Sequence, residues 1–263
     1  MKKIYLVIVA ALMTFNLQAN AAGGHGVVLD KVNLNMSDKP SLQRGAALFV
    51  NYCLSCHSAS YARYNRVAED LEIPLWQLKE NLMFTTDKEG DLMTTTMSEE
   101  DAKQWFGVAP PDLTLVSRVR KRDWVYTYLR AFYQDENSPS GWNNSLFENV
   151  AMPHALYELQ GVQRLVGKVE KDDHSAIDAH ADTATSADNQ KVVGDTVFEL
   201  VHPGKMSAVE FDQAMTDLTA FLVYLAEPAQ LKRHKIGVYT ILFLIVLTLL
   251  CYLLKKEYWR DVH

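Results

Sequence analysis

The feature that most constrains this chain is a Cys-x-x-Cys-His motif at residues 53–57. Each thiol can add to one vinyl group of a haem, and the two intervening residues set Cys53 and Cys56 about one helical turn apart. His57 follows directly, so its imidazole can reach the iron as the proximal ligand. The motif therefore predicts one covalently attached haem c.

Two other interpretations of this motif are weaker. A zinc site would need a second pair of cysteines, but the remaining cysteine, Cys251, lies in a long apolar run. A thioredoxin-like redox pair would need a strand-helix-strand context, which the neighbouring sequence does not show. Haem attachment is the interpretation that the adjacent His57 favours.

The first 21 residues have the pattern of a cleaved secretory signal. Lys2 and Lys3 form a charged start, residues 4–12 are apolar, and residues 19–21 form an Ala-x-Ala cleavage site. An uncleaved anchor is the alternative, but the apolar stretch is too short to span a bilayer. We expect residues 22–231 to form an exported haem domain, because bacteria attach haem c outside the cytoplasm.

Residues 236–254 form a second apolar segment, without a charged side chain. As a helix it would span roughly 28 Å, about one bilayer core, whereas a buried core helix is the alternative. Basic residues flank both ends, so the cleaved signal must fix the orientation. We expect a single-pass protein of the bacterial inner membrane, with its anchor at 232–254, its haem domain in the periplasm and residues 255–263 in the cytoplasm.

The exported part carries an excess of negative charge. Residues 22–235 contain 30 acidic and 21 basic side chains, a net charge of −9, whereas the whole chain has −6. This balance argues against nucleic-acid binding, which relies on basic residues, and it suits a basic protein partner. Ordinary solubility is the alternative explanation, and charge alone does not separate the two.

Apolar residues at helical spacing predict a mainly α body. We expect one helix to open at Pro40 and deliver the haem motif, and a short one to start at Ser98 and end at Gly107. Residues 123–133 should form a third helix. The strongest amphipathic pattern covers residues 207–225.

Other segments lack this spacing. Residues 79–97 and 135–149 are rich in polar and turn-forming residues, and we expect loops there. Residues 165–169 and 192–200 have strand-like sequences. The acidic stretch between them, at 168–191, predicts a long hairpin or a disordered insert.

The sixth position on the iron requires a ligand from elsewhere in the chain. Met152 is the first candidate, because a thioether suits iron and raises its reduction potential. Its long separation from His57 is expected, since the two ligands approach opposite faces of the haem. His154 is a rival that would lower the potential, and the other exported methionines remain possible: Met36, Met83, Met93, Met97, Met206 and Met215.

A proline-rich segment and a basic cluster add further candidates. Pro110 and Pro111 fix an extended backbone without N–H donors, so this segment can lie against the edge of a haem. A basic cluster follows and could pair with the haem propionates, for which Arg is the better bidentate partner. A solvated basic face is the alternative for most of its members, which are Arg118, Arg120, Lys121 and Arg122.

Taken together, these features resemble the cytochrome c1 family, the haem subunits of quinol–cytochrome c reductase (the cytochrome bc1 complex). The resemblance covers nearly all of the expected mature chain, although the acidic insert is longer than the family's usual hairpin. Besides the haem motif and the C-terminal anchor, it rests on Arg44-Gly45, Ala109-Pro110-Pro111-Asp112-Leu113, Ser117-Arg118-Val119-Arg120, Met152-Pro153, Met206-Ser207 and Ala226-Glu227-Pro228.

The resemblance implies a class I cytochrome c-like haem domain with long loop insertions and one C-terminal transmembrane helix. It implies that Met152 is the sixth ligand, that Arg120 contacts a propionate and that Pro111 packs near the haem. The chain would take one electron from the Rieske iron–sulfur protein and pass it to a soluble or tethered cytochrome c. It would make and break no bonds itself. It would assemble with cytochrome b, which binds the quinol.

Two other functions remain open on the sequence alone. A haem peroxidase or gas sensor would need an open or labile sixth site on the iron. A tethered cytochrome that feeds a terminal oxidase directly would keep the same ligands but would not assemble with cytochrome b.

Overall fold

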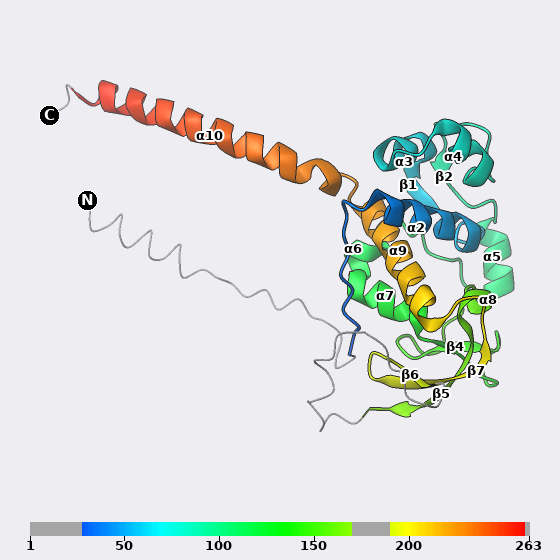
Figure 1. The fold of residues 1–263 in the computed structure, drawn as a ribbon. Helices are drawn as coiled ribbons and strands as arrows, with labels where there is room; N and C mark the ends of the chain where they lie inside the picture. The colour runs from blue at the N-terminus through cyan, green and yellow to red at the C-terminus, as the bar shows by residue number, and fades with distance from the viewer. Residues whose placement is uncertain (1–27, 170–189, 261–263) are drawn as a thin grey trace.

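The structure, a computed structural model, describes residues 28–169 and 190–260. Helices hold far more of these residues than strands, and they surround one apolar core from which a single long helix leaves (Figure 1). The helices are α2 (Lys39–Tyr52), α3 (Tyr64–Leu71), α4 (Leu75–Asn81), α5 (Glu99–Phe106), α6 (Val116–Arg120), α7 (Arg122–Arg130), α8 (Tyr157–Gln160), α9 (Ala208–Ala226) and α10 (Gln230–Tyr258).

The strands pair in small antiparallel sheets. β1 pairs with β2, β3 pairs with β4, and a sheet of order β5-β7-β6 lies at the end of the body below α7 in Figure 1. The strands are β1 (Ala59–Arg63), β2 (Leu92–Met93), β3 (Phe132–Gln134), β4 (Trp142–Asn144), β5 (Gly161–Lys168), β6 (Gln190–Val193) and β7 (Thr196–Pro203).

The core is organised by the crossing of α2 and α9. A Cβ added to Gly45 would lie 2.1 Å from the carbonyl oxygen of Asp217, so only glycine permits this close approach. Phe49 and Phe221 pack beside the crossing, with ring centroids 5.6 Å apart. This contact fixes the direction in which α2 leads into the haem motif.

Polar groups also join the two helices. The carboxylate of Asp217, 1% exposed, accepts hydrogen bonds from Ser41 Oγ at 2.6 Å, from Arg44 Nε at 2.6 Å and from Gln213 Nε2 at 3.0 Å. A buried carboxylate with these donors is satisfied, and it fixes the register of α2 against α9. Arg44-Gly45, which carried part of the resemblance, therefore has a packing role.

The predicted start of two helices and the predicted end of one coincide with capping residues. Ser207 and Glu210 form a reciprocal capping box at the start of α9. Ser98 accepts a hydrogen bond from Asp101 N at the start of α5, and α5 ends at Gly107, which has a φ of 77°. These ends agree with the sequence because each depends on residues within one turn.

Three expectations about chain segments were wrong. Residues 79–97 are not all loop, since α4 extends to Asn81 and β2 pairs with β1. Residues 135–149 contain β4, which pairs with β3. The helix expected over 123–133 ends at Arg130, because Phe132 and Tyr133 pair with β4. In each case a partner distant in sequence overrides the local pattern.

The strand-like run at 192–200 is a hairpin and not one strand. β6 and β7 are joined by a two-residue turn between the paired residues Val193 and Thr196. Gly194, in this turn, has a φ of 64°. β7 lies between β5 and β6, so the acidic insert does not join neighbouring strands. The interior of the insert and the expected signal at residues 1–21 lie outside the described residues.

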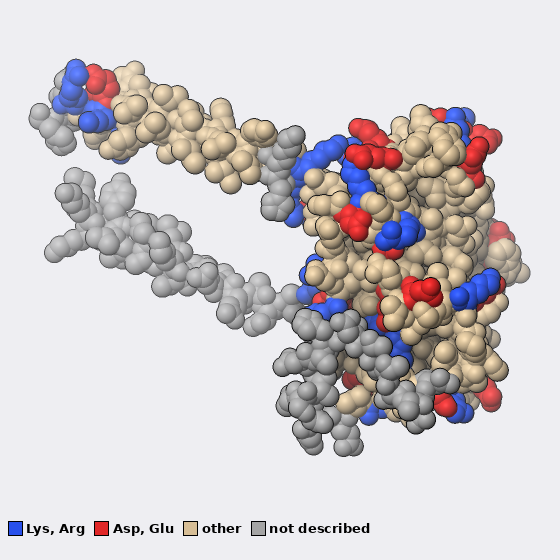
Figure 2. Space-filling model, viewed as in Figure 1, with Lys and Arg blue, Asp and Glu red and all other residues tan. Residues whose placement is uncertain are grey.

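The helix α10 contains the expected anchor and extends beyond both ends of it. Residues 236–258 contain an 18-residue stretch with a mean hydropathy of 2.5, and none of that stretch is buried within the described structure. Figure 2 shows an uncharged surface along this helix, with charged side chains near its ends. A span of this length and apolarity is sufficient to cross a bilayer.

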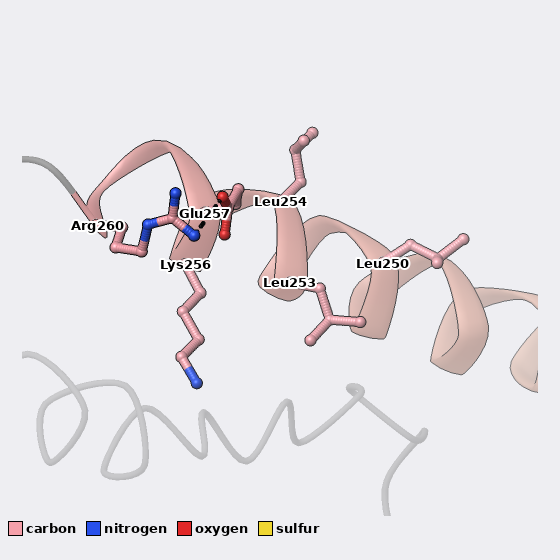
Figure 3. A pocket seen from close by; sticks show the side chains of 6 residues that line it. All are labelled: Leu250, Leu253, Leu254, Lys256, Glu257 and Arg260. Atoms are coloured by element: carbon pink, nitrogen blue, oxygen red, sulfur yellow. Dashed lines mark ion pairs between the residues drawn. The ribbon is translucent and has the colours of Figure 1, made fainter.

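The C-terminal end of α10 changes from apolar to charged within two turns. Glu257 and Arg260 form an ion pair at 2.7 Å (Figure 3). Leucines and charged residues line the same shallow hollow, and they are Leu250, Leu253, Leu254, Lys256, Glu257 and Arg260. The hollow is distant in sequence from every predicted haem residue, and it has the composition of a membrane–water boundary.

Candidate haem-binding site

The haem motif forms a tight turn at the end of α2. Cys53 N donates to Phe49 O at 2.9 Å, and Cys56 N and His57 N both donate to Cys53 O, at 3.0 and 2.8 Å. The exposed fractions of Cys53 and His57 are 9% and 8%, whereas Cys56 is half-buried. Burial raises the pKa of the Cys53 thiol to about 12, with a smaller contribution from Cys56.

The imidazole of His57 is held by the proline-rich segment. Its Nδ1 lies 2.7 Å from Pro111 O, so Nδ1 carries the proton and donates, and Nε2 keeps its lone pair. Burial lowers the pKa of His57, opposed by the Pro111 hydrogen bond and by Asp112. The ring is therefore neutral at neutral pH, which is the state that can bind a metal.

Residues 111–114 form a strap along the haem motif. Leu113 N donates to Ser58 O at 2.8 Å, and the Asp112 carboxylate accepts from Ser60 N at 2.7 Å and from Thr114 N at 2.8 Å. Burial opposes ionisation of Asp112, but these donors hold its pKa below the ordinary value. The strap thus fixes the carbonyl that orients His57.

A second group of side chains surrounds Met152. The Tyr128 hydroxyl donates to Met152 Sδ at 3.5 Å. The Trp124 ring stacks on Tyr128, with centroids 4.8 Å apart and an interplanar angle of 13°. The Arg120 guanidinium lies 4.9 Å from the centroid of the Trp124 ring. The predicted residues Arg120 and Met152 therefore belong to one connected cluster.

Five of the six rival methionines differ from Met152 in their surroundings, whereas Met97 is half-buried, as Met152 is. The exposed fractions of Met83, Met93 and Met215 are 8%, 1% and 0%, and core side chains enclose them. Met36 and Met206 also pack against this core. Among the methionines that the structure describes, only Met152 has a hydrogen bond to its sulfur.

His154, the other rival, is a core residue. Its ring stacks on Phe132 at 5.0 Å, and Trp142 contacts it edge-on at 5.1 Å. The residue is 2% exposed, and burial lowers its pKa to about 4. A haem could not reach this ring without displacing the aromatic side chains around it.

The basic cluster is less uniform than its sequence indicates. Arg122 pairs with the neighbouring Asp123 at 3.7 Å. Within residues 28–169 and 190–260, Arg120 forms no ion pair with a carboxylate, and its neighbours are the rings of Trp124 and Phe147. Its charge is thus available for an anionic group next to the Met152 cluster.

The site therefore has two sides. We call Cys53, Cys56, His57 and Pro111 the imidazole side, and Arg120, Trp124, Tyr128 and Met152 the thioether side. Residues 111–120 run from one side to the other through α6. No hydrogen bond or ring contact in the described part of the chain joins His57 to Met152.

The two sides fit a haem c. A neutral imidazole nitrogen and a thioether sulfur are a ligand pair suited to haem iron, two thiols lie next to the imidazole, and an arginine is available for propionates. Two residues of the site could not be identified from the sequence. Tyr128 contacts Met152, and Asp112 contacts the backbone of Ser60. No local sequence motif reveals either contact.

Comparison with known proteins shows the family of this chain. The Cytochrome C1 family profile matches residues 31–189 and 199–262. A cytochrome c1 from Allochromatium vinosum is 46% identical over 263 residues, which is 100% of both chains. A protein of Nitrosomonas europaea named ammonia monooxygenase gamma subunit is 43% identical over 92% of both chains.

A more distant relative is longer than this chain. The cytochrome b/c1 protein of Bradyrhizobium diazoefficiens is 25% identical over 86% of this chain, which corresponds to 34% of its own length. The family profile covers most of the chain, including the haem motif and α10. The chain belongs to the cytochrome c1 family, whose members carry haem c and transfer electrons as membrane-anchored subunits of the cytochrome bc1 complex.

Proposed function

We propose that this chain accepts one electron from the Rieske iron–sulfur protein and passes it to a soluble or tethered cytochrome c. A single haem c, attached through Cys53 and Cys56, supplies iron that changes between two oxidation states. The protein makes and breaks no substrate bond. Its residues hold the haem, set its potential and limit the access of water to the iron.

His57 and Met152 are the proposed iron ligands. The observation that carries this proposal is the 2.7 Å contact between His57 Nδ1 and Pro111 O, because it fixes the tautomer and directs Nε2 away from the strap. Met152 would approach the opposite face through Sδ. A thioether favours the reduced iron and so gives a higher potential than a second imidazole.

Arg120 and Pro111 have supporting roles in this proposal. Arg120 would pair with a haem propionate, which would neutralise a charge close to the thioether side. Pro111 would pack near the haem, and in addition its carbonyl orients His57. Both roles favour a haem held rigidly between two axial ligands, as an electron carrier requires.

The haem domain would lie in the periplasm of a bacterium, with α10 in the inner membrane and cytochrome b as a partner in the same complex. The short charged tail after α10 would remain in the cytoplasm. This orientation brings the haem to the side where the Rieske protein and cytochrome c exchange electrons. Quinol would bind to cytochrome b, and the acidic body would not bind nucleic acid.

One experiment tests both the partners and the orientation. Intact spheroplasts are labelled with an amine reagent that does not cross membranes, and the chain is then captured from solubilised membranes. We expect label on Lys103 and Lys205, which are 62% and 70% exposed, and none on Lys255 or Lys256. The captured material should show b-type and c-type haem spectra and contain the Rieske protein.

Other results of this capture would reject the proposal. A c-type spectrum without b-type haem would instead indicate a tethered cytochrome that feeds a terminal oxidase. Capture with monooxygenase subunits would favour the function that the name of the Nitrosomonas relative indicates. Label on Lys255 or Lys256, in the last turn of α10, would reverse the orientation.

The helix α5 is the proposed docking surface for the acceptor. Its first turn carries Glu99, Glu100 and Asp101, and Trp105 further along is 63% exposed. The segment before it is fixed to the haem motif, because Thr95 Oγ1 donates to Ser55 O at 2.7 Å. α5 also lies on the side of the body opposite to α10 (Figure 1). An exposed aromatic ring among carboxylates fits a basic cytochrome c.

Reversing one charge on α5 should slow docking. We expect Glu100→Lys to lower the association rate of a basic cytochrome c roughly fivefold at low salt, because it replaces an attraction by a repulsion. The difference should shrink near physiological salt, where charges further apart than ~8 Å are screened. Stopped-flow electron transfer at several ionic strengths measures both effects.

Glu69→Lys is the matched control, because it makes the same charge change on α3. Glu69 is exposed and adjacent to Asp70, which pairs with Lys232 at the base of α10, on the membrane side. This variant should keep the wild-type salt dependence. Equal rates for both variants would place the docking surface elsewhere on the body.

A further inference from the structure

One face of α7 continues into β3 as a row of aromatic rings. Trp124 and Tyr128 are four residues apart and stack with an interplanar angle of 13°. Phe132 follows after four more residues and meets Tyr128 nearly edge-on, with centroids 5.2 Å apart and an angle of 73°. The Tyr128 ring is therefore held from both sides, and this fixes the direction of its hydroxyl.

The hydroxyl of Tyr128 points at the sulfur of Met152, with O and Sδ 3.5 Å apart. Burial raises the pKa of the Tyr128 phenol above its ordinary value, opposed by the charge of Arg120, so the phenol is protonated at neutral pH and donates this hydrogen bond. A thioether sulfur has two lone pairs. One can accept from Tyr128 while the other remains for a metal.

We propose that Tyr128 is a positioning residue, whose O–H directs one lone pair of Met152 away from the iron ligand site and raises the reduction potential of the haem. This inference rests on the proposed ligation by Met152. It adds Tyr128, on α7, whose hydroxyl donates to that sulfur.

The sign of the effect follows from electrostatics. The positive end of the O–H dipole faces the sulfur and withdraws electron density from it. The sulfur then donates less to the iron, and the oxidised iron, which carries the larger positive charge, loses more stabilisation than the reduced iron. The hydrogen bond therefore favours the reduced state. The positive charge of Arg120, at the other end of the stack, acts in the same direction.

A purely structural role predicts a different result for a conservative variant. Tyr128→Phe keeps the ring, its stacking on Trp124 and its contact with Phe132, and it removes only the hydroxyl. If the ring merely fills space, this variant should have the wild-type potential. If the hydroxyl acts on the sulfur, the potential must change while the fold does not.

The test uses the full-length, haem-loaded protein in detergent. We expect Tyr128→Phe to lower the midpoint potential and to shift, without abolishing, the methionine–iron charge-transfer band of the oxidised protein. Tyr126→Phe is the matched control, because it makes the same change two residues earlier on α7. The Tyr126 ring lies 4.4 Å from the Arg130 guanidinium, so this variant should match the wild type in both measurements.

The outcomes separate this inference from the proposed ligation. An unchanged potential and band in Tyr128→Phe would overturn the role of Tyr128 and leave Met152 as the ligand. An equal fall in the potential of Tyr126→Phe would also overturn it, because the effect would then be general to α7. Persistence of the native band in Met152→Leu would reject the ligand and, with it, the role of Tyr128.

Discussion

Met152→Leu should lower the reduction potential by on the order of 0.1 V or more, within the roughly 0.8 V over which axial ligands act on haem. Leucine has a similar volume but no lone pair, so it cannot coordinate the iron. The methionine–iron charge-transfer band should disappear. The protein should still fold, because the proposed thioethers at Cys53 and Cys56 would retain the haem. Redox titration and absorption spectra of the purified chain measure both changes.

Two further variants make this result specific. Met152→His should also lower the potential but keep two axial ligands, because an imidazole replaces the thioether. Met206→Leu should leave potential and band unchanged, because Met206 packs against the core next to the start of α9. If Met152→Leu kept the band and potential, Met206 and His154 would be the next residues to test as ligands.

Gly45→Ala should destabilise the haem domain strongly. The added Cβ would lie 2.1 Å from Asp217 O and 2.8 Å from Phe221 Cβ. Neither atom can move aside by rotation of a side chain, because the first belongs to the backbone and the second is bonded directly to it. α2 and α9 would have to separate, which would weaken the hydrogen bonds from Ser41 and Arg44 to the Asp217 carboxylate. Overpacking of this kind costs about 3 kcal/mol, or roughly 6–12 °C in Tm for a chain of this size.

Gly90→Ala is the control, since a Cβ at Gly90 would have no neighbour within 4 Å. Its free energy of unfolding should stay within about 0.5 kcal/mol of the wild-type value. Urea unfolding, followed by circular dichroism, compares the two variants. A wild-type midpoint for Gly45→Ala would mean that the helices do not cross as closely as the structure has them.

The elements that the sequence predicted correctly are those specified by local signals. Ser98, Gly107 and Ser207 cap helices through neighbours within one turn, and α9 has a long apolar stripe. The errors occurred where distant residues decide the structure. Phe132 and Tyr133 continue the apolar pattern of α7, but their pairing with β4 takes them out of the helix.

The candidate site shows the same division. A contiguous motif was enough to predict Cys53, Cys56 and His57 as haem residues. The carbonyl of Pro111, which orients His57, and the hydroxyl of Tyr128, which contacts Met152, depend on how distant segments are folded together. Residue type alone could not distinguish Met152 from the methionines that fill the core, whereas burial could separate Met93 and Met215 from it.

Carbon monoxide binding to the reduced protein tests most directly whether this chain is an electron carrier with both axial positions filled. The wild type should show no spectral change with carbon monoxide, because the proposed ligands His57 and Met152 would occupy the two positions. Met152→Leu, measured alongside, should bind carbon monoxide readily, because its sixth position is open. Ready binding by the wild type would contradict the account and indicate a haem enzyme or gas sensor.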